Sequence, residues 1–252
     1  MGKANRGSRV ERYLLDVWRA RLLGYLKLSN CMEDCEGMRK PRVVVFASGT
    51  KTGGGSGFEN LVWRMRANFL QADIVAVVSN STDGGVKKRA QELSIPFVHF
   101  PKPRGTKEHQ ALIKKLRVEY VFLSGCLWLT QGLDPAKTIN IHPGPLPKFG
   151  GMGFYGARVH AAVLEAYRRG EIRKSAVCMH FVTARYDKGP IFFRKSVPIL
   201  PEDTIVTLAH RVNEVEHVWQ PYISNLVVTG EISWDGKDPK SLCVPAWYAV
   251  DM

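Results

Sequence analysis

From Pro41 onward the chain alternates short apolar runs with amphipathic segments, and this pattern restricts its possible folds more than any other feature. The run from Arg42 to Ala47 is rich in β-branched residues and ends at Ser48-Gly49, as is typical of a buried parallel strand. Further strands are expected at residues 74–78, 96–100, 120–123, 138–141, 176–181 and 191–197. Helices are expected at residues 60–70, 86–93, 106–117, 156–166 and 204–226, with Asp203 as the N-cap of the last. This βαβ alternation predicts one α/β domain with a mostly parallel central sheet, helices on both faces, and ligands at the carboxyl ends of the strands.

The chain divides into three parts by pattern. At 252 residues and 45% hydrophobic content, it is long enough for one substantial core. Residues 1–40 form a basic amphipathic extension, interpreted as a helix on the body or a partly disordered leader; acidic residues within it argue against a transit peptide or membrane-surface helix. Residues 41–236 are expected to form the main α/β domain, and residues 237–252 a C-terminal tail. No run approaches the roughly 20 apolar residues that a membrane span needs, so no membrane association is expected.

Charge and cysteine usage limit the partners and the compartment. Thirty-six Lys and Arg against 23 Asp and Glu give a net charge of +13, which favours anionic ligands. Because the basic residues are spread along the chain, small anionic substrates are favoured over nucleic acid. The five cysteines lack the spacing of a disulfide framework or a zinc site, so a reducing, cytoplasmic setting is expected. The sequence does not predict an oligomeric state.

A glycine-rich segment at residues 49–57 follows the first expected strand. Backbone N–H groups in such a loop can approach a phosphate, and the N-terminus of the next helix favours negative charge. The segment has neither the Walker spacing nor the GxGxxG spacing of dinucleotide sites. A mobile connection is the alternative, but the position after the first parallel strand favours an anion site.

Asn140 and His142 lie two residues apart near the end of an expected strand, so their side chains point to the same side of the sheet. A neutral amide and a protonated imidazole placed together can stabilise a developing oxyanion. Asp187, in a loop before Gly189-Pro190, would raise the imidazole pKa and direct proton transfer if the fold brings it close; otherwise it is a solvated turn residue. His160 and His180 lie near these loops and are candidates for support roles. No metal-ligand motif is present, so metal-free catalysis is expected.

The ordered set of glycine-rich loop, Asn-Ile-His-Pro, Leu-Pro-Lys-Phe-Gly-Gly, His-Phe-Val and Tyr-Asp-Lys-Gly-Pro resembles the folate-dependent formyltransferases that act on phosphoribosylglycinamide. The resemblance covers about residues 41–236 and implies a single Rossmann-like formyltransferase domain. It implies transfer of a formyl group from 10-formyltetrahydrofolate, as co-substrate, to the amine of glycinamide ribonucleotide in purine biosynthesis. It also implies direct attack by the amine, with Asn140 and His142 stabilising the oxyanion and Asp187 assisting proton transfer.

The same resemblance implies the binding residues. For the substrate these are Gly55, Ser56, Gly57, Asn213, Glu214, Val215 and Glu216. For the folate they are Leu127, Trp128, Leu129, Thr130, Asn140, Thr183, Ala184, Arg185, Tyr186 and Asp187. The glycine-rich loop is longer than is usual in this family, and Gly57 replaces its usual Asn, which removes a side-chain donor.

Several related activities remain as alternatives. A formyltetrahydrofolate deformylase or a formyltransferase for another amine acceptor would use a similar site. A methionyl-tRNA formyltransferase needs a carboxyl-terminal RNA-binding domain, for which the sequence after residue 226 is too short. A non-catalytic nucleotide- or RNA-binding protein is disfavoured by the presence of Asn140, His142 and Asp187.

Overall fold

The computed structural model describes residues 39–51 and 53–246 of the chain. The helix expected within residues 1–38 therefore lies outside the described residues, as do Cys31 and Cys35. The unit that follows, Lys40–Met252, is considered by itself.

A seven-stranded sheet forms the centre of this unit, with the strand order β3-β2-β1-β4-β5-β6-β7. The strands are β1 (Arg42–Phe46), β2 (Asp73–Ser79), β3 (Phe97–His99), β4 (Tyr120–Ser124), β5 (Thr138–His142), β6 (Lys174–Phe181) and β7 (Ile191–Pro198). Strands β1 to β5 pair in parallel, whereas β6 is antiparallel to β5 and to β7. The predicted mostly parallel sheet is confirmed. The strand order reverses between β1 and β4, which makes the gap beyond their carboxyl ends the expected ligand site.

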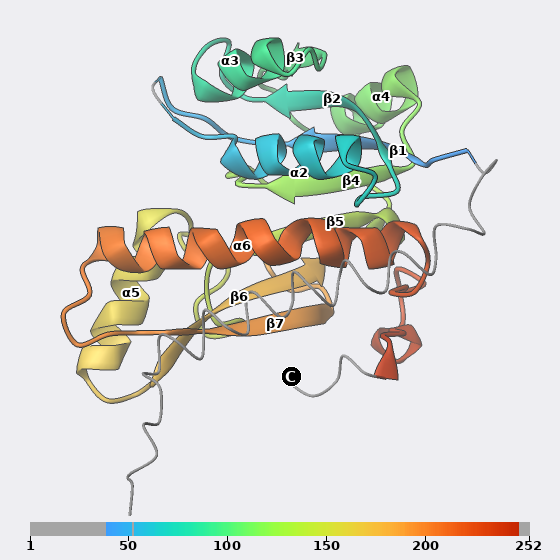
Figure 1. Cartoon of the computed structure of the whole chain (residues 1–252). Helices are drawn as coiled ribbons and strands as arrows, with labels where there is room; N and C mark the ends of the chain where they lie inside the picture. Colours follow the sequence, from blue (N-terminus) through green and yellow to red (C-terminus); the bar gives the residue numbers. More distant parts are fainter. Residues whose placement is uncertain (1–38, 52, 247–252) are drawn as a thin grey trace, which may run out of the picture. The chain divides into compact units, whose positions relative to one another are not determined.

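Helices cover both faces of the sheet (Figure 1). In the described part of the chain they are α2 (Ser56–Arg66), α3 (Gly85–Glu92), α4 (Thr106–Leu116), α5 (Ala157–Arg168) and α6 (Ile205–Val228), with short 3-10 helices η1 (Pro135–Lys137) and η2 (Pro239–Ser241). Helix α6 packs against α2, α5, β6 and β7. In Figure 1 it runs along the sheet beside α2, so the amino end of α2 and the middle of α6 can contribute to one site.

The core follows from the two-residue period of the buried strands. On one face Val44 and Phe46 of β1 pack with alternate residues of β2 and β4, and with Leu112 of α4. On the opposite face Val43 and Val45 are fully buried as well. Burial on both faces explains why β1 appears in the sequence as a continuous apolar run and not as an alternating one.

Most expected helices and strands match the structure within three residues, but helix α2 begins four residues earlier than the predicted Asn60. It starts directly after Gly55, whose φ of 82° places it in the left-handed region. The helix ends at Arg66, near Asn68, which also has a positive φ of 56°. The prediction was wrong because Ser56 and Gly57 are residue types typical of loops. In the structure they nevertheless form the first turn of the helix.

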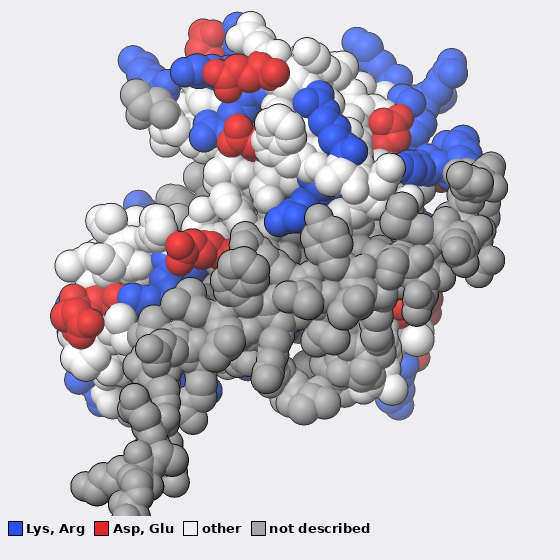
Figure 2. All heavy atoms as spheres, viewed as in Figure 1, with Lys and Arg blue, Asp and Glu red and all other residues white. Residues whose placement is uncertain are grey.

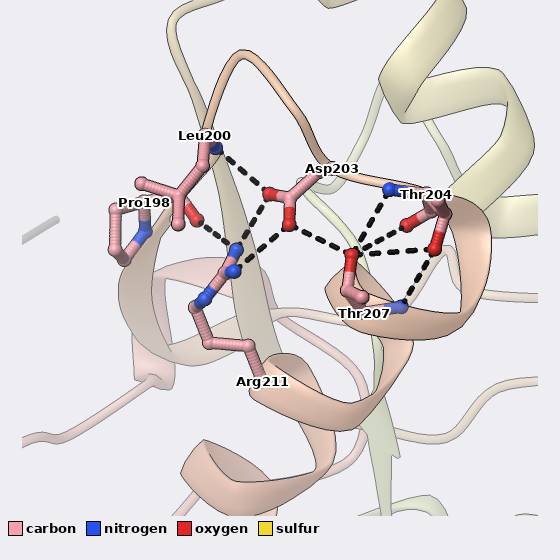
Figure 3. Close-up of polar contacts among 6 residues, drawn as sticks. All are labelled: Pro198, Leu200, Asp203, Thr204, Thr207 and Arg211. Carbon is pink, nitrogen blue, oxygen red and sulfur yellow. Dashed lines mark hydrogen bonds and ion pairs between the residues drawn. The ribbon is translucent and has the colours of Figure 1, made fainter.

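The N-cap of α6 is Thr204, and not Asp203 as predicted. The Thr204 side chain accepts a hydrogen bond from the N–H of Thr207 (Figure 3). Asp203 instead accepts the N–H of Leu200 at 2.8 Å, accepts the hydroxyl of Thr207 at 2.9 Å and pairs with both terminal nitrogens of Arg211 at 2.6 and 2.8 Å. The carboxylate thus fixes the entry of α6 by an ion pair that sequence spacing alone does not reveal.

Helix α6 contains Pro221, which has no N–H to donate to the carbonyl of His217 one turn earlier. The side-chain amide of Asn60, on α2, donates to that carbonyl at 2.7 Å. The turn of α6 that lacks a backbone hydrogen bond at Pro221 is therefore hydrogen-bonded to α2. Among the described residues, no helix is both long enough and apolar enough to cross a membrane.

Candidate active site

A cavity of about 500 Å³ opens beyond the carboxyl ends of β1, β4 and β5, where the strand order reverses. Its walls come from the segments that follow these strands, from the glycine-rich stretch Gly151 to Gly156, from Tyr186-Asp187 and from one side of α6. Asn140, His142 and Asp187 all line it. The fold therefore brings together the three residues that the sequence predicts as catalytic.

Asn140 on β5 lies directly opposite His180 on β6, and their side chains are in contact. The amide nitrogen Nδ2 of Asn140 lies 3.0 Å from Nε2 of His180. Nδ1 of His180 lies 2.7 Å from the carbonyl oxygen of Phe181, and a carbonyl oxygen only accepts, so Nδ1 carries the hydrogen. Nε2 of His180 therefore faces both the Asn140 amide and the Asp187 carboxylate. The three side chains form one polar cluster at this side of the cavity.

Asp187 holds a conformation that suits few residues, with φ of 52°. Its Oδ2 accepts the N–H of Gly151 at 2.8 Å, and its Oδ1 lies 3.3 Å from Nε2 of His180 and 3.5 Å from Nδ2 of Asn140. Burial raises the pKa of Asp187, but the hydrogen bond with His180, the charge of His142 and the Gly151 N–H together lower the pKa below its usual value. Asp187 is thus an anion within the site and not a solvated turn residue.

His142 is almost fully buried between two acceptors. Its Nε2 donates to the carbonyl of Phe149 at 2.7 Å, and its Nδ1 lies 3.8 Å from Oδ2 of Asp187. Burial lowers the pKa of His142, and the opposing effects of Asp187 and Phe149 are smaller. The expectation that Asp187 raises this pKa is correct for the pair, but the net direction is downward because desolvation dominates. An acceptor at each nitrogen suits the imidazolium form once a further negative charge approaches.

Only the last part of the glycine-rich loop reaches the cavity. The chain doubles back between Gly49 and Gly54, which form an isolated β-bridge, and Thr50 bonds to Gly53 through both its N–H and its hydroxyl. Beyond this turn, Gly54, Gly55, Ser56 and Gly57 line the cavity. The extra length that the sequence shows is taken up in the turn, so the anion-facing segment is short.

Helix α6 presents a stripe to the cavity, because residues three and four apart share a helix face. Asn213, Glu216, His217 and Gln220 line it. Burial raises the pKa of Glu216 to about 7, and the hydrogen bond from the Asn213 amide lowers it by less. Of the predicted substrate residues, Glu214 is exposed beside His210 and Val215 is fully buried, and neither lines the cavity.

Of the residues predicted to bind the folate, only some line the cavity. Leu127, Asn140, Tyr186 and Asp187 line the cavity. Trp128 instead stacks on Phe46 with ring centroids 5.8 Å apart. Leu129, Thr130, Thr183, Ala184 and Arg185 are likewise absent from the residues that line the cavity.

Several residues that line the cavity are not among the predicted catalytic and binding residues, although the sequence names His160 as a candidate for a support role. Met152 and Tyr155 are exposed at the glycine-rich stretch, and His160 is buried beside them with its Nδ1 unpartnered among the described residues. Burial, with a smaller effect of the His142 charge, lowers the pKa of His160 to about 4. Ser124 and Gln220 are buried and also line the cavity. The helical spacing of 213, 216, 217 and 220 is the one signal in the sequence that points to Gln220.

Within residues 39–51 and 53–246, no group of three or more His, Cys, Asp or Glu side chains is arranged to hold a metal ion. On the face seen in Figure 2, basic side chains are interspersed with acidic and neutral ones over the described surface.

Comparison with known proteins gives a consistent set of relatives. The formyl transferase family matches residues 41–224. A protein of Arabidopsis thaliana named chloroplastic phosphoribosylglycinamide formyltransferase is 33% identical over 207 residues, which are 78% of this chain and 68% of that protein. The phosphoribosylglycinamide formyltransferase of Bacillus subtilis (strain 168) is 33% identical over 193 residues, covering 72% of this chain and 92% of that protein. Among solved structures, glycinamide ribonucleotide transformylase 1 from Symbiobacterium toebii superposes with a TM-score of 0.69 at 26% identity, covering 81% of this chain and 94% of that one.

Proposed function

The chain belongs to the formyl transferase family, and we propose that it transfers a formyl group from 10-formyltetrahydrofolate to the amine of glycinamide ribonucleotide, a step of purine biosynthesis. The observation that carries the proposal is the convergence of Asn140, His142 and Asp187 in one cavity whose other end is the amino end of α2. That arrangement offers a place for an oxyanion at one end and a place for a phosphate at the other.

The three residues have separate tasks in this proposal. As the acceptor amine bonds to the formyl carbon, negative charge develops on the formyl oxygen. A donor of the Asn140 amide and the positive charge of the His142 imidazolium stabilise it. The bond from the formyl carbon to the folate nitrogen then breaks. The proton that the amine loses passes to that nitrogen, and Asp187, an anion at 3.8 Å from His142, directs the transfer. No covalent bond to the protein is formed.

Burial and charge support this assignment of His142. Desolvation holds the pKa of His142 low, but acceptors face both ring nitrogens. A developing oxyanion adds a second negative charge beside the ring, which favours the protonated form. The imidazolium is therefore stabilised most when the transition state needs it.

The binding residues divide along the cavity. Gly55, Ser56 and Gly57 at the amino end of α2 receive the phosphate, and Glu216 receives the acceptor amine with Asn213 beside it. The apolar side chains of Leu127 and Tyr186 form a wall for the folate ring system, which needs both apolar contact and backbone donors. The cavity of about 500 Å³ is within the range that such ligands require.

We also propose a catalytic domain of residues 41–236 and a cytoplasmic location. The match to the family over residues 41–224 supports the first. The free thiols of Cys126, Cys178 and Cys243 support a reducing compartment.

The test is acceptor-dependent release of tetrahydrofolate by the purified full chain. Tetrahydrofolate formed from 10-formyltetrahydrofolate only when glycinamide ribonucleotide is present, with formylated product found in equal amount, is the expected result. Release without acceptor would replace the proposal with a deformylase. Release with other amines but not with glycinamide ribonucleotide would contradict the proposed acceptor.

A further inference from the structure

A buried polar pair lies at the floor of the cavity, apart from the three residues of the proposed chemistry. The hydroxyl of Ser124, at the end of β4, donates to Oε1 of Gln220 on α6 at 3.1 Å. Ser124 is 7% exposed and Gln220 is 2% exposed. Because the Ser124 hydroxyl binds the oxygen of the amide, the Nε2 end of Gln220 is turned away from Ser124.

Gly57 makes room for this pair. A Cβ atom built at Gly57 would overlap Oγ of Ser124 and would lie 3.1 Å from Oε1 of Gln220. Gly57 is in the first turn of α2 and lines the cavity. Any side chain at position 57 would therefore compete with the Ser124–Gln220 pair for the same space.

The pair leaves one donor without a partner. Among the described residues, no hydrogen bond is formed by Nε2 of Gln220, and the residue is 2% exposed and lines the cavity. Gln220 therefore meets the cavity through an amide that keeps a donor available, and an acceptor on the ligand would complete its hydrogen bonding.

Nearby charges indicate which ligand group this acceptor belongs to. Helix α2 has no side-chain cap at Gly55, so its first N–H groups are directed to the cavity. Arg89, which contacts this loop, is paired with Glu59 at 2.7 Å and donates to the carbonyl of Gly54 at 3.1 Å. The local field is thus that of a helix N-terminus with neutral side-chain donors, which suits an anion rich in acceptor oxygens.

We propose that Gln220, held by Ser124 and accommodated by Gly57, supplies from helix α6 a side-chain amide donor for the phosphate group of the substrate. The proposal rests on the function proposed above and deepens it. It assigns the substrate's anchoring contact partly to α6, and makes Gln220 a specificity-determining residue for phosphorylated over unphosphorylated acceptors. In this proposal the Gln220 amide supplies the side-chain donor that Gly57 does not provide.

The experiment compares Gln220→Met, which keeps the length but removes the donor, with wild type and with Gln91→Met, an exposed glutamine on α3. The Kd of ribose 5-phosphate, with ribose as the control, is measured by calorimetry, and steady-state kinetics are measured with glycinamide ribonucleotide. Loss of a hydrogen bond to a charged acceptor predicts about a tenfold or larger rise in both the Kd of ribose 5-phosphate and the KM for glycinamide ribonucleotide. The KM for the folate and the kcat are expected to stay within about threefold.

Two further variants separate a binding role from a packing role. Ser124→Ala keeps the amide but frees its orientation, and a rise of about threefold in the same constants is expected. Gln220→Glu keeps the shape but adds a negative charge, and a larger rise than for Gln220→Met is expected. Equal losses for all variants, matched by a fall in melting temperature, would indicate packing alone and overturn the inference.

The outcomes also separate this inference from the proposed function. Gln220-dependent binding of ribose 5-phosphate without formyl transfer to glycinamide ribonucleotide would remove the proposed function and support the phosphate contact. Normal transfer with unchanged constants in Gln220→Met would support the function and overturn the contact. Failure of the wild-type protein to bind any phosphorylated probe would overturn the contact as well.

Discussion

Asn60 of α2 donates a hydrogen bond of 2.7 Å to the main-chain carbonyl of His217 in α6, the carbonyl that Pro221 leaves without its helical partner. The bond joins the two helices that supply the anion end of the cavity. Ser56 and His217 are also 3.3 Å apart through Oγ and Nε2. The position of α6 relative to the amino end of α2 is therefore set by polar contacts close to the site.

Asn60→Ala should destabilise the fold by about 1–3 kcal/mol, because the carbonyl of His217 then has no donor. Pro221→Ala in the same chain restores an N–H within α6, so the double variant should lose less than the sum of the two single variants. Urea unfolding of all four proteins gives the coupling energy. Additive losses would show that Asn60 acts elsewhere.

His142→Ala should lower kcat by about 10²- to 10³-fold, the usual effect of removing one donor from an oxyanion site. His210→Ala is the control, since His210 is exposed on α6 beside Glu214. Circular dichroism checks that both variants are folded. Turnover near that of wild type in His142→Ala would contradict the proposed role.

Asp187→Asn tests charge with little change of shape, because Asn also tolerates the positive φ of 52° at this position. Without the carboxylate the pKa of His142 should fall further, since Asp187 is the main group that raises it. The expected result is a kcat lower by about 100-fold and a histidine titration, followed by NMR of the ring, at lower pH than in wild type. An unchanged titration would show that the two side chains do not interact in solution.

Glu216 is expected to make substrate binding depend on pH. Its pKa is raised to about 7 by burial, so it is largely protonated below that pH and a carboxylate above it. A carboxylate attracts the acceptor amine, and the KM for that substrate should therefore fall as the pH rises through about 7. In Glu216→Gln this change should disappear and leave only the titration of the substrate itself. A persisting step near pH 7 would assign it to another group.

Asp203 should stabilise the fold at neutral pH and lose that effect in acid. Burial raises its pKa, but Arg211, the N–H of Leu200 and the hydroxyl of Thr207 lower it below the usual 3.8. A depressed folded-state pKa means that the contribution is complete above the unfolded value and is lost as the pH falls through the folded value. Asp203→Asn should cost about 3 kcal/mol at pH 7, because the partly buried Arg211 loses the negative charge of Asp203 beside it.

The difference between wild type and Asp203→Asn should shrink as the pH falls below about 4. Denaturant unfolding at pH 7 and pH 3 measures it, with the exposed Glu202→Gln as a control. A difference that is constant across this range would mean that the charge of Asp203 is not what stabilises the entry of α6.

The sequence predicts the sheet and the position of two proposed catalytic residues for the same physical reason, which is local periodicity. The two-residue period of a strand places Asn140 and His142 on one side, and buried parallel strands show continuous apolar runs. The convergence with Asp187 depends on the antiparallel pair β6 and β7, which brings its loop back to β5. Sequence distance does not encode that pairing.

Contacts between distant segments account for what the sequence did not reveal. Glu214 and Val215 adjoin Glu216 in sequence, but helical rotation carries them away from the cavity. Gln220 faces inward on the same helix, and its partner Ser124 lies 96 residues earlier. The start of α2 and the cap of α6 were misplaced because tertiary contacts outweigh the local preference of glycine, serine and aspartate at those positions.

The bridge between Gly49 and Gly54 closes the turn, so the length of the turn does not set the position of the residues that line the cavity. The chain returns to the cavity at Gly54, and the exposed Lys51 does not line it. A group attached to Lys51 therefore need not contact the ligand. The turn is thus a natural attachment point for a fluorescent reporter, close enough in sequence to register events at Gly54 and outside the wall of the cavity.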